Sequence, residues 1–402
     1  MAPNLPPLVT IQEPTPPSSL NGMPLFRLGF RPFYLGAALL AALAVPIWIG
    51  MFFGRLPLNP AVAPVLWHAH EMLFGFAIAV IVGFLMTAGK AWTGLATPRG
   101  PALAALFVLW LAARLASVAS SYPVYAVLDV LFLPVVAVIF LKLLLRANNR
   151  RNLPLAALLM LLAGSNIAFH LAVSERLAIP PVNALHAALA LIILIECVMA
   201  GRVIPAFTMS ATPGLKLHNH PGMEKLTLLL TLLALSLWVF TPGGWMSMMV
   251  LATAAVLHVQ RQWQWQPWVT RGRPLLWILH VAYAWIPLGL GLLALAQIGI
   301  VPVSAGLHAL AVGATGGLII AMMTRTARGH TGRQLMPTRA EVVAYALLVL
   351  AATLRVFLPL LSPTLLPVSL IGTALAWTAA FTIYLFIYTP WLLQSRADGR
   401  DG

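Results

Sequence analysis

The sequence predicts an all-α polytopic membrane protein with twelve transmembrane helices, and three observations support this prediction. Of its 402 residues, 61% are hydrophobic and 8% are charged, and the mean hydropathy is +0.92, which is outside the range of soluble domains. The apolar residues gather into twelve runs that are long enough to cross a bilayer as helices. The basic residues concentrate between alternate runs, as expected for loops on the cytoplasmic side.

The twelve predicted spans follow one another with short connections. They lie at 33–53, 65–88, 101–118, 124–145, 153–173, 182–204, 225–240, 244–261, 275–297, 301–325, 340–358 and 364–390. Residues 1–24 are proline-rich and lack the apolar core of a signal peptide, so they are predicted to be a flexible cytoplasmic arm. The single membrane domain is therefore predicted to occupy residues 25–392, with a cytoplasmic tail at 393–402.

The net charge of +15 does not indicate binding to nucleic acid, because of where the basic residues lie. Twenty of the 24 Lys and Arg residues fall at the two termini or in alternate loops, and the intervening loops hold only Arg55 and Arg176. By the positive-inside rule, both termini are predicted to be cytoplasmic. The charge therefore indicates topology in a lipid membrane.

A short pattern recurs at the start of the second, sixth and tenth spans. Each apolar run begins with a His-Ala pair, at His68, His186 and His308, which are 118 and 122 residues apart. Arg114 follows His68 by 46 residues and Arg355 follows His308 by 47, whereas the middle unit lacks the arginine. The pattern predicts three four-helix pseudo-repeats, at about 33–145, 153–261 and 275–390.

Five histidines and two arginines are expected at one depth near the outer surface, because a helix rises about 1.5 Å per residue. They are His68, His70, His170, His186, His308, Arg114 and Arg355. One interpretation is that they are interfacial residues bonded to water or headgroups. The other is a metal or haem site, because ionisable groups in membranes usually face a cavity and imidazole is the commonest metal ligand.

Histidines from three spans at one level can surround a metal ion or bind a haem from both faces. Two arginines nearby can pair with the propionates of such a haem, because guanidinium matches carboxylate geometry. His68 and His70 cannot face the same partner, since residues two apart on a helix diverge.

The single cysteine, Cys197, excludes an intrachain disulfide and a cysteine-rich metal site. Glu196 in the sixth span is either a proton relay or a hydrogen-bonded structural carboxylate.

Several motifs along the chain resemble those of a known family. The stretches "LFRLGFRPFYLGA", "LWHAHEMLFGFAIAVIVGFLMTA", "WTG", "GRVIPAFT" and "MMTRTARGHTGR" occur in this order over most of the chain, and they resemble the NnrS family of bacterial inner-membrane proteins. The resemblance implies a membrane protein that contains haem b and copper and is associated with denitrification and resistance to nitric oxide. Its implied partners are nitric oxide, membrane lipid and an electron donor that the sequence does not identify.

A more distant resemblance is to the catalytic subunit of haem-copper oxidases and nitric oxide reductases. That subunit also has twelve helices in three groups of four, and "HAHEM" at His68 and "HALAVGA" at His308 resemble its haem-ligand segments on the second and tenth helices. The sequence lacks the adjacent histidine pair of the seventh helix and the His-x-His of the tenth. The resemblance therefore implies one bis-histidine haem and argues against a full binuclear centre.

The leading hypothesis is a redox protein that acts in nitric oxide metabolism or in protection from nitrosative stress. It assigns His68 and His308 as axial haem ligands and places Arg114 and Arg355 at the propionates. The candidates for copper or a second metal are His70, His170 and His186. The hypothesis assigns no catalytic residues. It includes a haem-dependent oxidoreductase that acts on nitric oxide as one interpretation.

Two alternatives stay open from the sequence. One is a twelve-helix transporter, although the loop "GKAWTGLATPRG" lacks the acidic and paired basic residues of the major-facilitator family and the repeat here is threefold. The other is a non-catalytic factor that sequesters metal or nitric oxide, which requires the same ligands as an enzyme.

Overall fold

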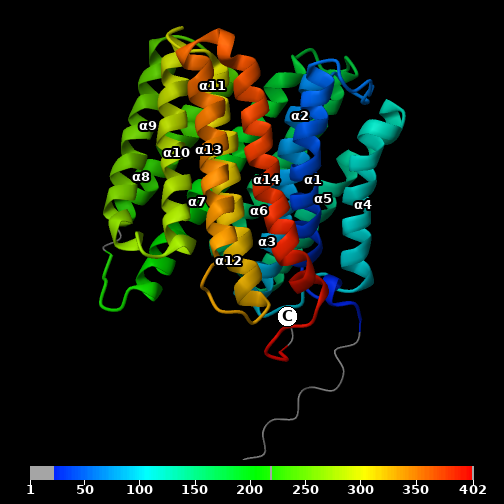
Figure 1. Cartoon of the computed structure of the whole chain (residues 1–402), viewed down its shortest axis with the longest axis vertical. Helices are drawn as coiled ribbons and strands as arrows, with labels where there is room; N and C mark the ends of the chain where they lie inside the picture. Colours follow the sequence, from blue (N-terminus) through cyan, green and yellow to red (C-terminus); the bar gives the residue numbers. More distant parts are fainter. Residues whose placement is uncertain (1–21, 218–219, 401–402) are drawn as a thin grey trace, which may run out of the picture.

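The computed structural model describes residues 22–217 and 220–400, and within this part of the chain every regular element is a helix. The long helices run side by side in one bundle, and both ends of the described chain lie at the same end of it (Figure 1). The prediction of an all-α membrane protein is confirmed. Residues 1–21 of the predicted arm and 401–402 of the predicted tail lie outside the described residues.

The helices keep the order and nearly the limits that the apolar runs predict. The first half of the bundle contains α1 (Phe30–Phe52), α2 (Pro64–His70), η2 (Glu71–Ala77), α3 (Ile78–Thr93), α4 (Pro101–Ala119), α5 (Tyr122–Arg146), α6 (Leu153–Val173) and α7 (Pro181–Ala211). The second half contains α8 (Pro221–Phe240), α9 (Trp245–Gln264), α10 (Pro274–Gln297), α11 (Val303–His308), η5 (Ala309–Gly316), α12 (Gly317–His330), α13 (Arg339–Leu361) and α14 (Leu366–Leu393). Short 3₁₀ turns lie at Pro24–Phe26 (η1), Arg150–Asn152 (η3), Pro267–Thr270 (η4) and Pro363–Leu365 (η6).

Eleven of the described helical segments are long and apolar enough to cross a membrane, which makes this a multi-pass membrane protein. The remaining predicted span, the eighth along the chain at 244–261, is α9, which packs against α8 and α10 (Figure 1). Its last turns carry Gln260, Arg261 and Gln262. Arg261 is buried and forms an ion pair with Glu224 of α8, so this end of α9 is polar because it holds a buried charge.

Proline marks the start of most of these helices. A proline lies in the first turn of α2, α4, α5, α6, α7, α8, α10 and α14. Proline fixes a helical φ and lacks an N–H, and the first-turn N–H groups of a helix have no intrahelical acceptor anyway. The residue therefore starts these helices without loss of a hydrogen bond.

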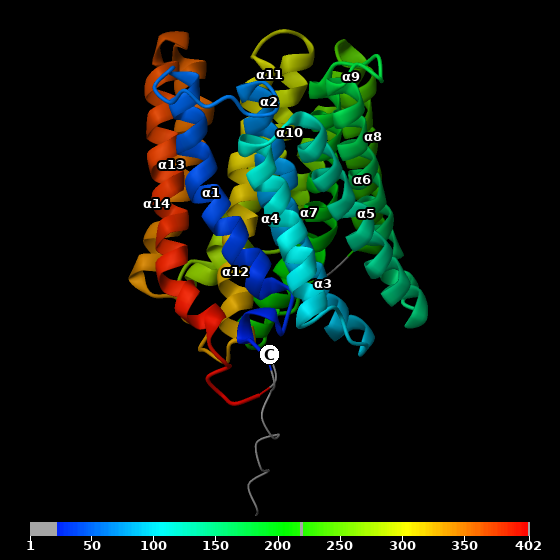
Figure 2. The same ribbon diagram turned by 90° about the vertical axis from the view of Figure 1, so that its right-hand side faces the viewer.

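The first and last spans pack together and close the bundle. α1 lies beside α14 in both views (Figures 1 and 2), and Trp377 Nε1 donates a hydrogen bond to the Ala41 carbonyl at 3.1 Å. The guanidinium of Arg31, at the start of α1, donates to the carbonyls of Leu392 and Gln394 at 2.8 and 2.7 Å. A cation is favourable at a helix C-terminus, where carbonyl groups lack intrahelical partners.

The second and tenth spans share an irregularity. Each continues from a short α-helix into a π-helical segment, η2 directly after His70 and η5 directly after His308. A π-helical turn contains an extra residue, changes which side chains share a face, and occurs often at functional sites. The two spans that carry the first and third copies of the His-Ala pattern are therefore alike in backbone as well as in sequence.

Candidate functional site

A cavity of about 410 Å³ lies at the end of the bundle opposite the termini, between the starts of α2 and α11 (Figure 1). Three of its lining residues are His68, His186 and His308, and we call it the histidine cavity. Arg355 of α13 also lines it, and most of the remaining wall is apolar, with side chains from α1, α7 and α14. The fold thus brings the three repeated histidines to the wall of one cavity.

Two of these imidazoles have a ring nitrogen that is free to act as a ligand. His308 Nδ1 lies 2.7 Å from the Ser304 carbonyl, and because a carbonyl only accepts, Nδ1 carries the hydrogen and Nε2 keeps its lone pair. His68 stacks on Trp48 with ring centroids 4.1 Å apart, and its buried Nδ1 has no hydrogen-bond partner among the described residues. A second bond that orients the ring is typical of metal-ligating histidines.

Arg355 places a positive charge at the wall of the same cavity. Its Nη2 lies 3.5 Å from the Ser304 hydroxyl, and no carboxylate pairs with it among the described residues. A cation held among apolar groups calls for an anionic partner. Neutral imidazole donors, broad apolar walls that include Trp48 and Trp377, and this unpaired guanidinium together fit a haem with its carboxylates.

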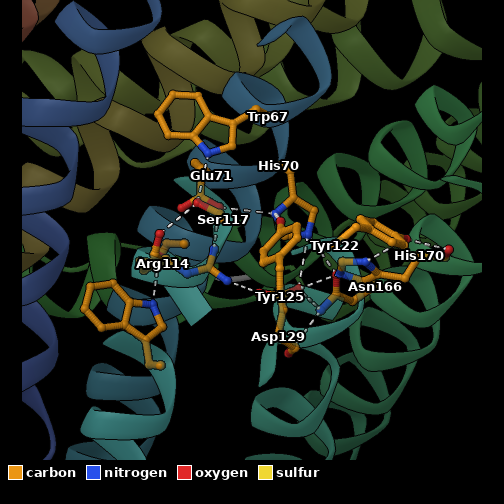
Figure 3. Close-up of polar contacts among 12 residues, drawn as sticks. Trp67, His70, Glu71, Arg114, Ser117, Tyr122, Tyr125, Asp129, Asn166 and His170 are labelled. Atoms are coloured by element: carbon orange, nitrogen blue, oxygen red, sulfur yellow. Dashed lines mark hydrogen bonds and ion pairs between the residues drawn. The ribbon is translucent and has the colours of Figure 1, made fainter. Parts of the chain in front are cut away.

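A second polar site surrounds His70, which lies two residues after His68 on α2 (Figure 3). We call it the His70 network, and it consists of His70, Glu71, Arg114, Tyr125, Asp129, Asn166 and His170. All of these residues are buried. They come from α2, η2, α4, α5 and α6, so the network joins all the spans of the first pseudo-repeat except α1 to the first span of the second.

Both ring nitrogens of His70 are engaged within the network. Nδ1 lies 2.9 Å from the Tyr125 hydroxyl, and Nε2 lies 2.9 Å from Asn166 Oδ1. His70 Nε2 also approaches Asp129 Oδ2 at 3.2 Å, and His170 Nε2 lies 3.0 Å from that same oxygen. Ligand atoms of His70, Asp129 and His170 lie within 4.8 Å of one another. Two imidazoles and one carboxylate that converge in this way fit a first-row transition metal.

The network carries one more negative charge than positive charges when its histidines are neutral. Arg114 Nη1 donates to Glu71 at 3.1 Å and Nη2 donates to Asp129 Oδ1, so one guanidinium serves two carboxylates. An uncompensated charge in a membrane interior is costly. A bound cation or an added proton at this place would balance it.

The structure separates the predicted site residues into two groups. His68, His186, His308 and Arg355 line the histidine cavity, and His70, His170 and Arg114 belong to the His70 network. Arg114 pairs with the carboxylates of Glu71 and Asp129, and its contact with a haem propionate stays a prediction. His186, predicted for a second metal, lies in the cavity of His68 and His308.

The sequence patterns assign no role to Asn166, Tyr125 or Asp129. Their signal in the sequence is modest, because each is one polar residue within a long apolar span. Their importance follows from the way α5 and α6 turn these three side chains toward His70. Asn166 Nδ2 donates to Asp129 Oδ2 at 2.7 Å, which fixes the carboxylate between the two histidines.

Comparison with known proteins adds one match. Residues 24–396 match the family described as NnrS protein, so the match covers nearly the whole chain and both sites. The search of curated proteins found no match.

Proposed function

The chain belongs to the NnrS family, and on that premise we propose that it binds haem and copper in the bacterial inner membrane and acts in nitric oxide metabolism or protection from nitrosative stress. The observation that carries this proposal is the histidine cavity, where imidazoles with available nitrogens face an apolar space beside an unpaired guanidinium. The charge distribution supports cytoplasmic termini, and in this proposal the cavity lies near the periplasmic side.

In this proposal the imidazoles of His68 and His308 would hold a b-type haem. The Ser304 carbonyl orients the imidazole of His308, and the Trp48 ring holds that of His68. Arg355 pairs with a propionate, because it is the cation at the cavity wall without a carboxylate of its own. When bound, the haem would supply a redox-active iron that exchanges electrons, and nitric oxide would bind that iron in place of one of the two histidines.

The His70 network is the proposed copper site. His70 and His170 supply imidazole nitrogens and Asp129 supplies an oxygen, while Asn166 and Arg114 hold that carboxylate in place. A cation here would also offset the excess negative charge of the network. His186 remains a further imidazole ligand for a metal or small molecule within the histidine cavity.

Nitric oxide, membrane lipid and an electron donor are the proposed partners. An oxidoreductase and a sequestering factor use the same ligands, and they differ in turnover. An apolar cavity beside haem ligands admits a small uncharged molecule such as nitric oxide, because no charge has to be desolvated on entry.

The test begins with the protein purified in detergent. Iron and copper per chain are measured, and reduced-minus-oxidised spectra are recorded with and without nitric oxide. Stoichiometric haem whose bands shift with nitric oxide is the expected result, and consumption of nitric oxide with an added reductant would identify an enzyme. Haem that is bound but unresponsive would move the chemistry to the second metal, and a metal-free protein would overturn the proposal in favour of a transporter.

A further inference from the structure

Glu196 lies on α7, and the sequence left two roles open for it, a proton relay or a hydrogen-bonded structural carboxylate. Its Oε2 is buried without a hydrogen-bond partner among the described residues. It lines a small cavity of about 90 Å³, the middle cavity, whose wall is otherwise apolar except for Tyr34 of α1. A buried carboxyl that is left unbonded costs free energy, and such a group calls for a function.

On one side, Glu196 faces the histidine cavity through Thr315 of η5. Thr315 is the side chain that interacts with the Glu196 carboxyl, and it also lines the histidine cavity. Its Oγ1 is buried and makes no direct hydrogen bond of ordinary geometry with any described residue. The Thr315 hydroxyl is thus near the Glu196 carboxyl and retains hydrogen-bonding capacity for a water molecule.

On the other side, the middle cavity adjoins a third cavity, toward the end of the bundle that carries the termini. A cavity of about 810 Å³ lies there, which we call the basic cavity because Arg151, Arg202, Arg325 and Arg396 line it. The two cavities share four wall residues, which are Phe84, Met199, Val203 and Met322. Water in the basic cavity is thus one layer of side chains away from the middle cavity.

A second threonine, Thr326, lies beside a buried polar side chain where the middle cavity meets the basic cavity. Tyr34 lines the middle cavity, Thr326 lines the basic cavity, and the two side chains interact. The Tyr34 hydroxyl is buried and, like Thr315, makes no direct hydrogen bond of ordinary geometry. The order across the bundle is therefore basic cavity, Thr326, Tyr34, middle cavity, Glu196, Thr315 and histidine cavity.

We propose that Glu196 relays protons from the basic cavity to the histidine cavity along this order, with water in the middle cavity. A proton from water in the basic cavity passes by way of Tyr34 to the Glu196 carboxylate. The resulting carboxylic acid releases it through Thr315 to a base in the histidine cavity, and the carboxylate is protonated again from the basic side. The middle cavity has room for water, which needs about 10–15 Å³ and polar partners, and Glu196 and Tyr34 provide those partners.

The use of the proton at the histidine cavity rests on the proposed function, whereas the route can be tested without it. The first measurement is infrared spectroscopy of the purified protein during transfer into D₂O. The C=O stretching band belongs to the protonated Glu196 carboxyl, the form that carries the proton in this route. The band is assigned by its loss in Glu196→Gln, a nearly isosteric variant, and by its displacement in Glu196→Asp. We expect the assigned band to shift promptly in D₂O, because water reaches the carboxyl.

Two matched tyrosine variants test the basic side of the route. Tyr34→Phe should slow the exchange on the order of 100-fold, the lower end of what a positioned proton-transfer group contributes. Tyr384→Phe removes another buried hydroxyl without a hydrogen-bond partner, from a residue that lines none of the three cavities, and should leave the rate unchanged. A carboxyl that stays unexchanged for hours, or one that exchanges equally fast in Tyr34→Phe, would overturn the proposal.

The other side of the route needs the haem-loaded protein. Reduction should shift the Glu196 band in the wild type and in Thr373→Val, which alters the histidine-cavity wall at another threonine. Thr315→Val should abolish that shift. A shift that persists in Thr315→Val would overturn the link to the histidine cavity, and a protein without haem would contradict the proposed function while the exchange result still stands.

Discussion

His68 and His70 lie two residues apart in α2, and they differ in the hydrogen bonds and the neighbouring groups of their imidazoles. His68 faces the histidine cavity, stacks on Trp48 and leaves Nδ1 without a partner. His70 faces a network in which both ring nitrogens are engaged and a carboxylate lies within 3.2 Å. The two histidines of this motif therefore belong to different sites. His68 faces the histidine cavity, which has space for a ligand, whereas His70 belongs to the charged, hydrogen-bonded His70 network.

The largest expected effect concerns haem. His68→Ala and His308→Ala should each lose stoichiometric haem, because each removes one axial ligand. His186→Ala should retain it, and so should His70→Ala, which lies on the other face of the same helix. The measurement is the haem content per chain of each purified variant. A normal haem spectrum in both His68→Ala and His308→Ala would show that the axial assignment is wrong.

The next effect is on stability, and the two arginines predicted to be equivalent provide a matched pair. Arg114→Met leaves Glu71 and Asp129 buried without their cation, and we expect the free energy of unfolding to fall by about 3–5 kcal/mol. Arg355→Met breaks no ion pair, so a change below about 1 kcal/mol is expected. Thermal unfolding of both variants without haem, in one detergent, measures the difference.

A triple variant sharpens the same comparison. Neutralising both carboxylates of Arg114→Met, with Glu71→Gln and Asp129→Asn, should recover part of the lost stability, because no unpaired charge then remains buried. Equal losses in Arg114→Met and Arg355→Met, with no recovery in the triple variant, would show that the His70 network does not depend on its ion pairs.

Loss of a ligand in the network is expected to have a smaller effect. Asp129→Asn should lower the apparent copper affinity by about 10–100-fold, a range typical even of groups that only support ligands, while haem content stays unchanged. Copper titration monitored on the purified variant measures this, and Glu71→Gln is the control because it removes a charge from the network without removing a ligand. If Asp129→Asn bound copper as tightly as Glu71→Gln does, Asp129 would not be a copper ligand.

Much of this arrangement follows from the sequence by simple geometry. Apolar runs and first-turn prolines fix the helices, and the rise per residue places His68, His186 and His308 at one depth. Their meeting in one cavity was foreseeable for that reason. The two-residue offset between His68 and His70 also predicted their divergent directions.

The rotation of each helix about its axis was not predictable in the same way. Arg114 and Arg355 occupy equivalent places in the repeat, yet Arg114 meets Asp129 of α5 whereas Arg355 meets Ser304 of α11. This difference depends on Asp129, an aspartate that the first unit has at its fourth span. The π-helical segments η2 and η5 also change which faces the second and tenth spans present. Spacing alone cannot show a register change of this kind.

The smallest expected effect concerns which group of Ser304 orients the imidazole of His308, the carbonyl or the hydroxyl. The Ser304 hydroxyl lies 3.2 Å from His308 Nδ1 and 3.5 Å from Arg355, whereas the Ser304 carbonyl lies 2.7 Å from the same Nδ1. Ser304→Ala keeps the carbonyl, so haem should be retained and stability should change by less than about 1 kcal/mol. Haem content and thermal unfolding measure the two quantities. Loss of haem in Ser304→Ala would mean that the hydroxyl holds the ligand, and the histidine cavity would then depend on side-chain hydrogen bonds as the His70 network does.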